Sequence, residues 1–325
     1  MGGQHRQLGL SLERKFLREQ QLDSFWRFVC ERQRIWYRRF AEKRNPPWTE
    51  DPILRTVRFT NVYRELDPGT KFAVQHILEQ PISINDKIFN IMLYRLIGRL
   101  ETFSEIGLQS LSDFDPPSLE SKLKFIRDVE RKPPFSSAYT VSSYTQMGSH
   151  DKIENVARLF SRLHEKFEEL FNQIMTAQDA QDAFNAIRRS YGFGTFLSYQ
   201  VLVDLLYPLE SNSGRAILPF SHDDWAIAGP GAQRGIHLLL RENISLDELE
   251  VMRWLRNNQR SEFERLELDF PYLTDKQAGQ IEISLSNIEN CLCEFNKYVS
   301  VGTKGRARRR FDPPATQELT KWLTA

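Results

Sequence analysis

Cysteine is scarce in this chain, and long apolar runs are missing. The 325 residues include three cysteines, Cys30, Cys291 and Cys293. An odd and sparse set argues against a disulfide framework, and three thiols are too few for a four-cysteine iron–sulfur cluster. No apolar run approaches the ~18 residues that a membrane-spanning helix needs. The sequence therefore predicts a cytoplasmic protein with no metal centre, no cofactor and no membrane contact.

Several catalytic motifs are also missing. The six histidines are scattered and form no His-x-x-x-His pair, and neither a Gly-x-Ser-x-Gly elbow nor a Walker loop occurs. A His-x-x-x-His pair is typical of a zinc site on a helix, and a Gly-x-Ser-x-Gly elbow is typical of a serine hydrolase. Hydrolysis by a serine triad and ATP binding by a P-loop therefore have no support in the sequence.

Charge is balanced overall, with a formal net charge of +1, but it is unevenly distributed. Residues 1–44 contain eleven Lys and Arg against five Asp and Glu, and residues 301–310 contain five basic residues and no acidic one. Basic ends on an acidic body can hold a polyanion at chosen places. We therefore expect Arg306, Arg308 and Arg309 to contact DNA, although solvated charged termini would show the same pattern.

Apolar residues recur mostly at helical spacing, which predicts an all-α protein with two packed helical lobes. We expect a basic extension over residues 1–20, a helical catalytic domain over 21–299 and a basic tail over 300–325. Helices are expected over residues 22–44, 51–66, 70–80, 84–106, 118–131, 150–175, 178–190, 195–207, 246–266 and 274–298, with a further helix opening after Gly229-Pro230-Gly231.

A glycine-rich turn joins two of these helices. Gly192 and Gly194 allow the positive φ and close approach that a tight turn between helices requires. They also leave backbone amides bare at the start of the second helix, where an anion such as a DNA phosphate can bind. We therefore expect Gly192, Phe193, Gly194 and Thr195 to bind DNA. The alternative is an ordinary connection between two packed helices.

Two carboxylates, Asp223 and Asp224, follow this turn. A carboxylate can stabilise positive charge or activate water, so both residues are candidate catalytic groups. The alternative is that one of them caps a helix ahead of Trp225.

Three polar or glycine-rich segments could form a pocket for a base flipped out of DNA. Each also has a plain structural interpretation, as a helix end, an ordinary turn or a solvated helix face. The expected pocket residues are Asn61, Tyr63, Arg64, Gly229, Gly231, Arg234, Glu289, Asn290 and Lys297.

Together these segments resemble a known family. A helix, a Gly-x-Gly turn, a second helix and a later acidic cluster are similar to the layout of helix-hairpin-helix DNA glycosylases. Five longer motifs in the same order resemble the α-glutamyl/putrescinyl thymine pyrophosphorylases, which are related to those glycosylases. The motifs are FWRFVCERQRIWYRR, FTNVYRELD, YGFGTFLSYQVLVDL, DDWAIAGPGAQRGI and IENCLCEFNKY.

The resemblance implies an enzyme that acts on hypermodified pyrimidines in phage DNA. Our first interpretation is a monofunctional DNA glycosylase in antiphage defence, acting as a monomer on double-stranded DNA. By the resemblance, Asp224 or Asp223 would assist cleavage of the bond between base and sugar. The alternatives are a transferase that replaces pyrophosphate on a modified thymine with an amino acid or amine, and a non-catalytic DNA-binding protein.

Overall fold

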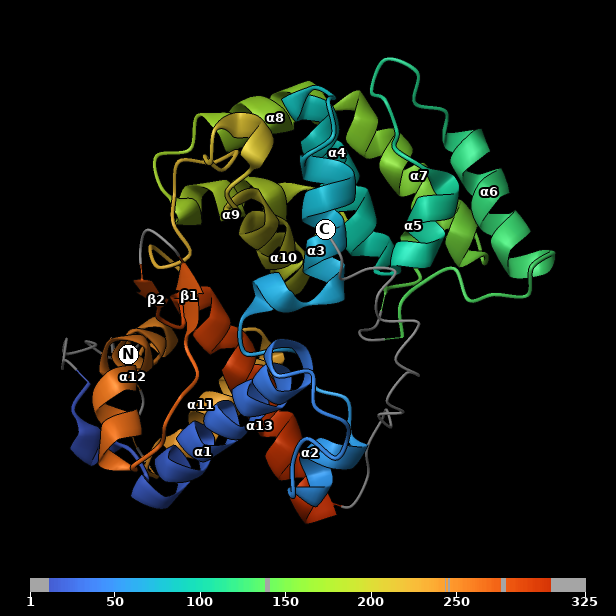
Figure 1. The fold of residues 1–325 in the computed structure, drawn as a ribbon. Helices are drawn as coiled ribbons and strands as arrows, with labels where there is room; N and C mark the ends of the chain where they lie inside the picture. The colour runs from blue at the N-terminus through green and yellow to red at the C-terminus, as the bar shows by residue number, and fades with distance from the viewer. Residues whose placement is uncertain (1–11, 138–140, 243, 245, 276–278, 305–325) are drawn as a thin grey trace, which may run out of the picture. The chain divides into compact units, whose positions relative to one another are not determined.

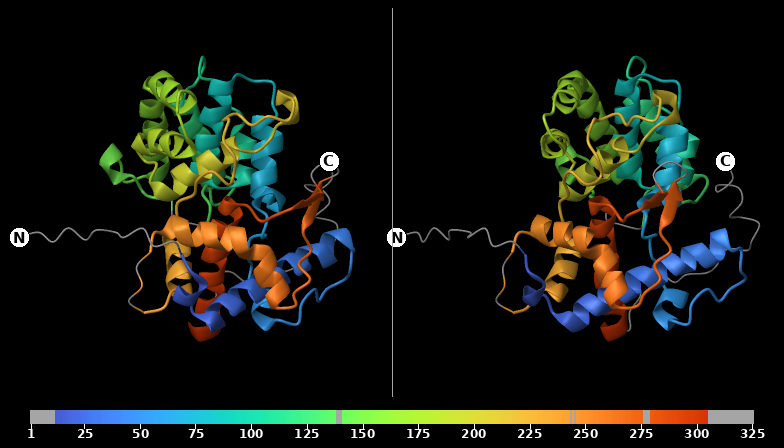
Figure 2. Two further views of the ribbon diagram at one scale, coloured as in Figure 1. Left: turned by 90° about the vertical axis from the view of Figure 1, so that its left-hand side faces the viewer. Right: turned by 60° about the vertical axis from the view of Figure 1, so that its left-hand side comes forward.

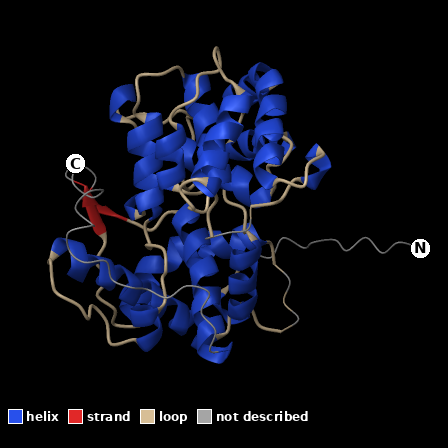
Figure 3. Ribbon diagram, turned by 90° about the vertical axis from the view of Figure 1, so that its right-hand side faces the viewer, coloured by secondary structure: helices blue, strands red, loops and turns tan. Residues whose placement is uncertain are grey.

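The computed structural model describes residues 12–137, 141–242, 244, 246–275 and 279–304. α-Helices predominate in this part of the chain, and its one sheet is a pair of three-residue strands (Figures 1 and 3). The prediction of an all-α fold is therefore confirmed. None of the described helices is both long and apolar enough to cross a lipid bilayer.

The chain divides into two compact units. Unit 1 combines the N-terminal part, up to Arg64, with the C-terminal part from Ala226 onward, whereas unit 2 is the continuous stretch Glu65–Trp225. Unit 1 contains α1 (Glu19–Trp36), α2 (Pro52–Thr56), α11 (Pro230–Leu239), α12 (Glu248–Arg265), β1 (Leu273–Asp275), β2 (Gly279–Ile281) and α13 (Leu285–Lys304). Unit 2 contains α3 (Pro68–Ala73), α4 (Ile84–Ile97), α5 (Leu100–Ile106), α6 (Pro116–Asp128), α7 (Lys152–Glu165), α8 (Phe167–Met175), α9 (Ala180–Arg189) and α10 (Thr195–Leu205). The predicted division at residues 20 and 300 stays a prediction.

The core of unit 1 forms around α13, which packs against α1, α2, α11 and α12. Figure 2 shows the red α13 beside the blue α1 and the orange α12. Phe25 of α1 meets Phe295 of α13 with ring centroids 5.5 Å apart, and Trp26 meets Phe263 of α12 at 4.9 Å. Burial of one such side chain is worth about 1.5–3 kcal/mol, so these contacts fix the three helices together.

The core of unit 2 forms around α4, whose side chains are buried on nearly every side. A helix that is apolar all round belongs in the interior of a domain. An ion pair links it to α10, where Asp204 accepts a hydrogen bond from Arg95 Nε at 2.5 Å. This buried ion pair joins α4 to α10, the helix that follows the glycine-rich turn.

Local sequence signals set many of the helix starts. Side chains of Ser or Asp cap five helices by accepting hydrogen bonds from first-turn amides, which satisfies donors that the helix itself leaves unpaired. The capping residues are Asp51, Ser83, Asp151, Asp179 and Asp247. Because these signals are local, the sequence located most helices within a few residues.

Four predicted helices are wrong in part. Those expected over residues 84–106 and 150–175 are each divided in two, into α4 and α5 and into α7 and α8. The helix expected over residues 51–66 ends at Thr56, where Val57 is extended. The rest of this segment is hydrogen-bonded to α13 and is helical again only in the short 3-10 helix Arg64–Leu66. The helix expected over residues 274–298 begins only at Leu285, because the preceding residues pair as the antiparallel strands β1 and β2. After α2, contacts with the distant α13 outweigh the local periodicity, whereas before α13 the pairing of two neighbouring strands does so.

Candidate functional site

The predicted site residues fall in both units. The glycine-rich turn and the two aspartates belong to unit 2, and all nine expected pocket residues belong to unit 1. The predicted DNA contacts Arg306, Arg308 and Arg309 lie outside the described residues.

Gly192 is required by the turn between α9 and α10. Its φ is +86°, in the left-handed region that favours glycine, and a Cβ built there would lie 2.7 Å from Cδ1 of Leu159. The hydroxyl of Tyr144 donates to the Gly192 carbonyl at 3.1 Å and holds the turn against the rest of unit 2. A side chain at this position would therefore disturb the fold itself.

Gly194 has a different environment. It is the residue before α10, its φ of −77° is open to any amino acid, and a Cβ there would meet nothing within 4 Å. No side chain caps α10, so its N-terminus within unit 2 has the geometry at which an anion can approach backbone amides. Thr195 begins that helix.

The aromatic residues around the turn differ in exposure. Phe193, one of the four turn residues predicted to bind DNA, is 2% exposed, and its ring centroid lies 6.5 Å from that of Phe160 in the core. Tyr191 and Phe196 are 44% and 39% exposed. In unit 2 the accessible aromatic surface at this turn thus belongs to two residues that were not predicted to bind DNA, because the spacing of apolar residues does not show which side chains face solvent.

Asp224 organises a turn rather than a helix end. Its carboxylate accepts hydrogen bonds from the amide and the hydroxyl of Ser221, both at 2.8 Å, and the amide of Asp223 donates to the same hydroxyl at 3.1 Å. Both aspartates are exposed. The alternative of a helix cap ahead of Trp225 is wrong, since the next helix, α11, begins at Pro230.

The expected pocket residues from three distant segments do come together in unit 1. The extended chain after α2 is tied to α13 by two asparagines. Asn290 Nδ2 donates to the Asn61 carbonyl at 3.0 Å, and the Arg64 amide donates to Asn287 Oδ1 at 2.9 Å. Asn287 was not foreseen, although its position one turn before Asn290 places both on one face of the helix.

The side chains of this extended segment are engaged within unit 1. Arg32 of α1 donates to Asn61 Oδ1 at 2.8 Å, and the buried Tyr63 donates its hydroxyl proton to the Ile281 carbonyl at 2.6 Å. Lys297 donates to the Arg58 carbonyl and, at 3.1 Å, to the carboxylate of Glu294. These contacts hold the segment in a defined conformation along α1 and α13.

Glu289 is the most unusual group in this region. Its carboxylate is buried on α13, accepts a hydrogen bond from the Gly229 amide at 3.1 Å, and lies near the buried guanidinium of Arg64. Burial raises the pKa of Glu289, while Arg64 and the Gly229 amide act in the opposite direction. Buried acids with a specific charge partner are common at functional sites, so this pair supports the expected pocket.

The glycines of α11 serve helix packing. A Cβ at Gly231 would lie 2.2 Å from Cys293 Sγ, and one at Gly235 would lie 2.3 Å from the Leu292 carbonyl oxygen. The two helices therefore approach so closely that only hydrogen fits at both positions. Arg234, between them, is exposed.

Cys293 of α13 lies in an environment that keeps its thiol protonated. Burial, followed by the charges of Glu289 and Glu294, raises the pKa of Cys293 to about 12, so its thiol stays protonated. Within the residues the structure describes, no group of three or more His, Cys, Asp or Glu side chains is arranged to hold a metal ion.

The described residues define a mainly helical protein with a glycine-rich turn between α9 and α10 and a buried polar group, Glu289, on α13. Residues 19–306 match the family model described as "5-hmdU DNA kinase, helical domain", and the chain belongs to that family. It is 29% identical over 290 residues to the 5-hmdU DNA kinase of Bacillus phage SP10, a match that covers 85% of this chain and 44% of the relative. The chain thus spans less than half the length of this curated relative. No solved structure matches.

These comparisons correct the sequence-based function. The prediction of a DNA glycosylase, and with it of a hydrolase, is wrong, because the family and the relative are described as kinases. The predicted connection to enzymes of hypermodified thymine is confirmed in its general form, but the pyrophosphorylase family is not the one that matches. Amides that hold a phosphate suit any enzyme that works on DNA, so such a pattern does not reveal which bond is made or broken.

Proposed function

We propose that this chain recognises DNA carrying a thymine modified at its 5-methyl carbon and serves an enzyme that transfers a group to that base. The observation that carries this proposal is the match over residues 19–306, which includes described elements of both units. The base named in the family description, 5-hmdU, has a hydroxyl on the carbon that is a plain methyl in thymine. A hydroxyl is the natural acceptor for a transferred phosphoryl group.

The geometry supports separate tasks for the described features. The open N-terminus of α10 beside Gly194 suits a DNA phosphate, whichever base is present. The buried pair Arg64 and Glu289, with the half-buried Asn290 beside Glu289 on α13, offers charged and amide groups. Such groups distinguish one base from another through hydrogen bonds. We propose that Asp223 and Asp224 also belong to the DNA-facing residues of unit 2.

A binding and transfer experiment tests this function. Two duplexes that differ only by thymine or 5-hydroxymethyluracil at one position are titrated with the protein, and the same mixtures are incubated with ATP and digested to nucleosides for mass spectrometry. We expect tighter binding to the hydroxymethylated duplex. Equal affinity for both duplexes would contradict base recognition.

A further inference from the structure

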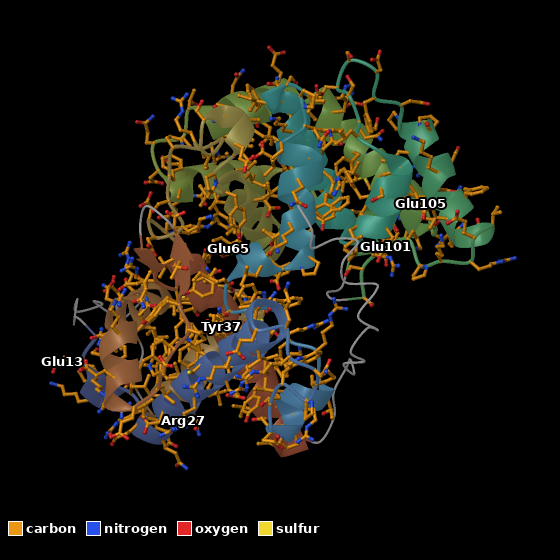
Figure 4. The ribbon with its side chains drawn as sticks, viewed as in Figure 1. Glu13, Arg27, Tyr37, Glu65, Glu101 and Glu105 are labelled. Atoms are coloured by element: carbon orange, nitrogen blue, oxygen red, sulfur yellow. The ribbon has the colours of Figure 1, made fainter. Side chains whose placement is uncertain are left out.

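Unit 1 contains a basic segment, of whose Arg and Lys residues only Arg32 and Arg58 were described above. Residues 27–58 contain nine Arg and Lys and four Asp and Glu. The exposed members include Arg27, Lys43, Arg44 and Arg55. Figure 4 labels Arg27 on α1 and the exposed Tyr37, which follows that helix. The surplus of positive charge makes this segment attractive to a polyanion.

The same segment contains a surface cavity of about 340 Å³. We call it the Trp48 cavity. It is lined by Ile35, Pro46, Pro47, Trp48, Leu54 and Arg55, with Thr49 beneath. Its volume is near the lower end of the range of small-molecule sites, and its walls are mostly apolar, as in such sites.

Trp48 is held in place on several sides. Its indole N–H donates to the Arg44 carbonyl at 2.7 Å, and its own carbonyl accepts from Arg38 at 2.6 Å. The guanidinium carbon of Arg39 lies 4.8 Å from the ring centroid, a favourable cation–π distance. The ring is therefore a rigid platform, which lowers the entropy lost when another flat group packs against it.

We propose that the Trp48 cavity binds an unstacked base of DNA, with the neighbouring phosphates held by the surrounding arginines. An aromatic wall in a basic groove is the combination used for single-stranded nucleic acid, because the ring stacks on a base while cations follow the backbone. Apolar walls alone would suit many ligands, but Arg55 at the cavity and the charge of the segment favour a polyanion. The inference rests on the proposed function, since it requires DNA at unit 1.

The first test compares a fully paired duplex with the same duplex carrying one unpaired thymine, by fluorescence anisotropy. Base–aromatic stacking is worth about 1–3 kcal/mol, so Trp48→Ala should weaken binding to the unpaired-thymine duplex about tenfold or more. Binding to the paired duplex should change less than about twofold, because backbone contacts do not depend on the ring. Trp48→Phe keeps an aromatic face and should retain most of the preference. Trp254→Ala, a half-buried tryptophan on α12 away from the cavity, is the matched control.

A second measurement uses the wild-type protein and can therefore be made even if Trp48→Ala fails to fold. The unpaired thymine is replaced by 5-iodouracil, the wild-type complex is irradiated, and the crosslinked peptide is identified by mass spectrometry. We expect the crosslink in the peptide that contains Trp48. A crosslink at another peptide would overturn this inference and leave the proposed function standing. So would an equal loss of affinity of Trp48→Ala for both duplexes. Absence of binding to any DNA would overturn both.

Discussion

The side-chain carboxylate of Glu289 accepts a hydrogen bond from the backbone amide of Gly229 over 3.1 Å. Gly229 immediately precedes α11, and Glu289 lies near the start of α13, so the bond joins the N-terminal ends of two helices. A carboxylate at a helix N-terminus is favoured by the helix dipole, yet complete burial disfavours its charge. The balance between these two effects determines the direction in which the pKa of Glu289 is shifted.

The first prediction concerns the pH dependence of stability. The pKa of Glu289 is raised in the folded protein, so its contribution to stability is fully present below the ordinary glutamate pKa of about 4.3 and is lost as pH rises through the folded-state value. Glu289→Gln keeps an acceptor for the Gly229 amide and does not titrate. We expect the parent to lose free energy of unfolding relative to this variant as pH rises from about 4, measured by urea unfolding.

Glu264→Gln removes an exposed carboxylate on α12 and is the charge-matched control for that experiment. Parallel stability profiles for the parent and Glu289→Gln at all pH values would show that the carboxyl does not carry the predicted shift.

The second prediction concerns the contact between α11 and α13. Gly235→Ala should destabilise unit 1 by about 1–3 kcal/mol or more, since the added Cβ meets the backbone of Leu292, which is not free to rotate away. Gly231→Ala meets the side chain of Cys293 instead, so Cys293→Ala should recover part of its loss in a double-mutant cycle. Thermal and urea unfolding measure both effects.

Gly302→Ala is the control for these glycine substitutions. It lies on α13, where a Cβ would be at an ordinary 3.4 Å from Ile53, and alanine is the better helix former by about 1 kcal/mol. This variant should be as stable as the parent or more so. Equal stability of Gly235→Ala and Gly302→Ala would contradict the close approach of the two helices.

The third prediction separates binding from folding at the turn between α9 and α10. Gly194→Leu enters open space and should leave the protein folded, but its side chain should hinder a phosphate at the start of α10. Hydrogen bonds to charged groups are worth about 1.5–3 kcal/mol, so affinity should fall about tenfold or more and equally for thymine and 5-hydroxymethyluracil duplexes. Fluorescence anisotropy titrations measure the affinity for each duplex.

Gly192→Ala provides the contrast. Its positive φ and the 2.7 Å approach to Leu159 predict a loss of stability instead. Unchanged DNA affinity in well-folded Gly194→Leu would remove this turn from the proposed DNA contacts.

The fourth prediction concerns the basic tail. Each phosphate contact changes the slope of log affinity against log salt by about 0.9, so replacing Arg306, Arg308 and Arg309 with alanine should make the slope shallower by up to about 3. Binding titrations at several salt concentrations give the slope. Arg253→Ala on α12 controls for the loss of a positive charge elsewhere. The same slope in the triple variant and the parent would show that the tail does not contact DNA.

Much of the fold was predictable because its signals are local. α9, the glycine turn and α10 were foreseen almost to the residue, since capping by Asp179 and the positive φ of Gly192 depend on nearby sequence. The chain after α2 was not foreseen. Its apolar residues have helical spacing, but its conformation depends on hydrogen bonds from Asn290 and to Asn287, more than 200 positions away.

The sequence by itself determined that this protein is helical, that two glycines join α9 to α10, and that its ends are basic, because periodicity, turn chemistry and charge are properties of neighbouring residues. Only the tertiary structure decided that Asn290 bonds the Asn61 carbonyl and that the Glu289 carboxylate lies near Arg64 and the Gly229 amide. It also decided that Gly231 and Gly235 lie against α13 and that Phe193 is buried. Burial and proximity depend on which distant surfaces pack together. On a solvent-exposed helix face, the same glutamate would have no raised pKa and the same glycines would make no close contact with another helix.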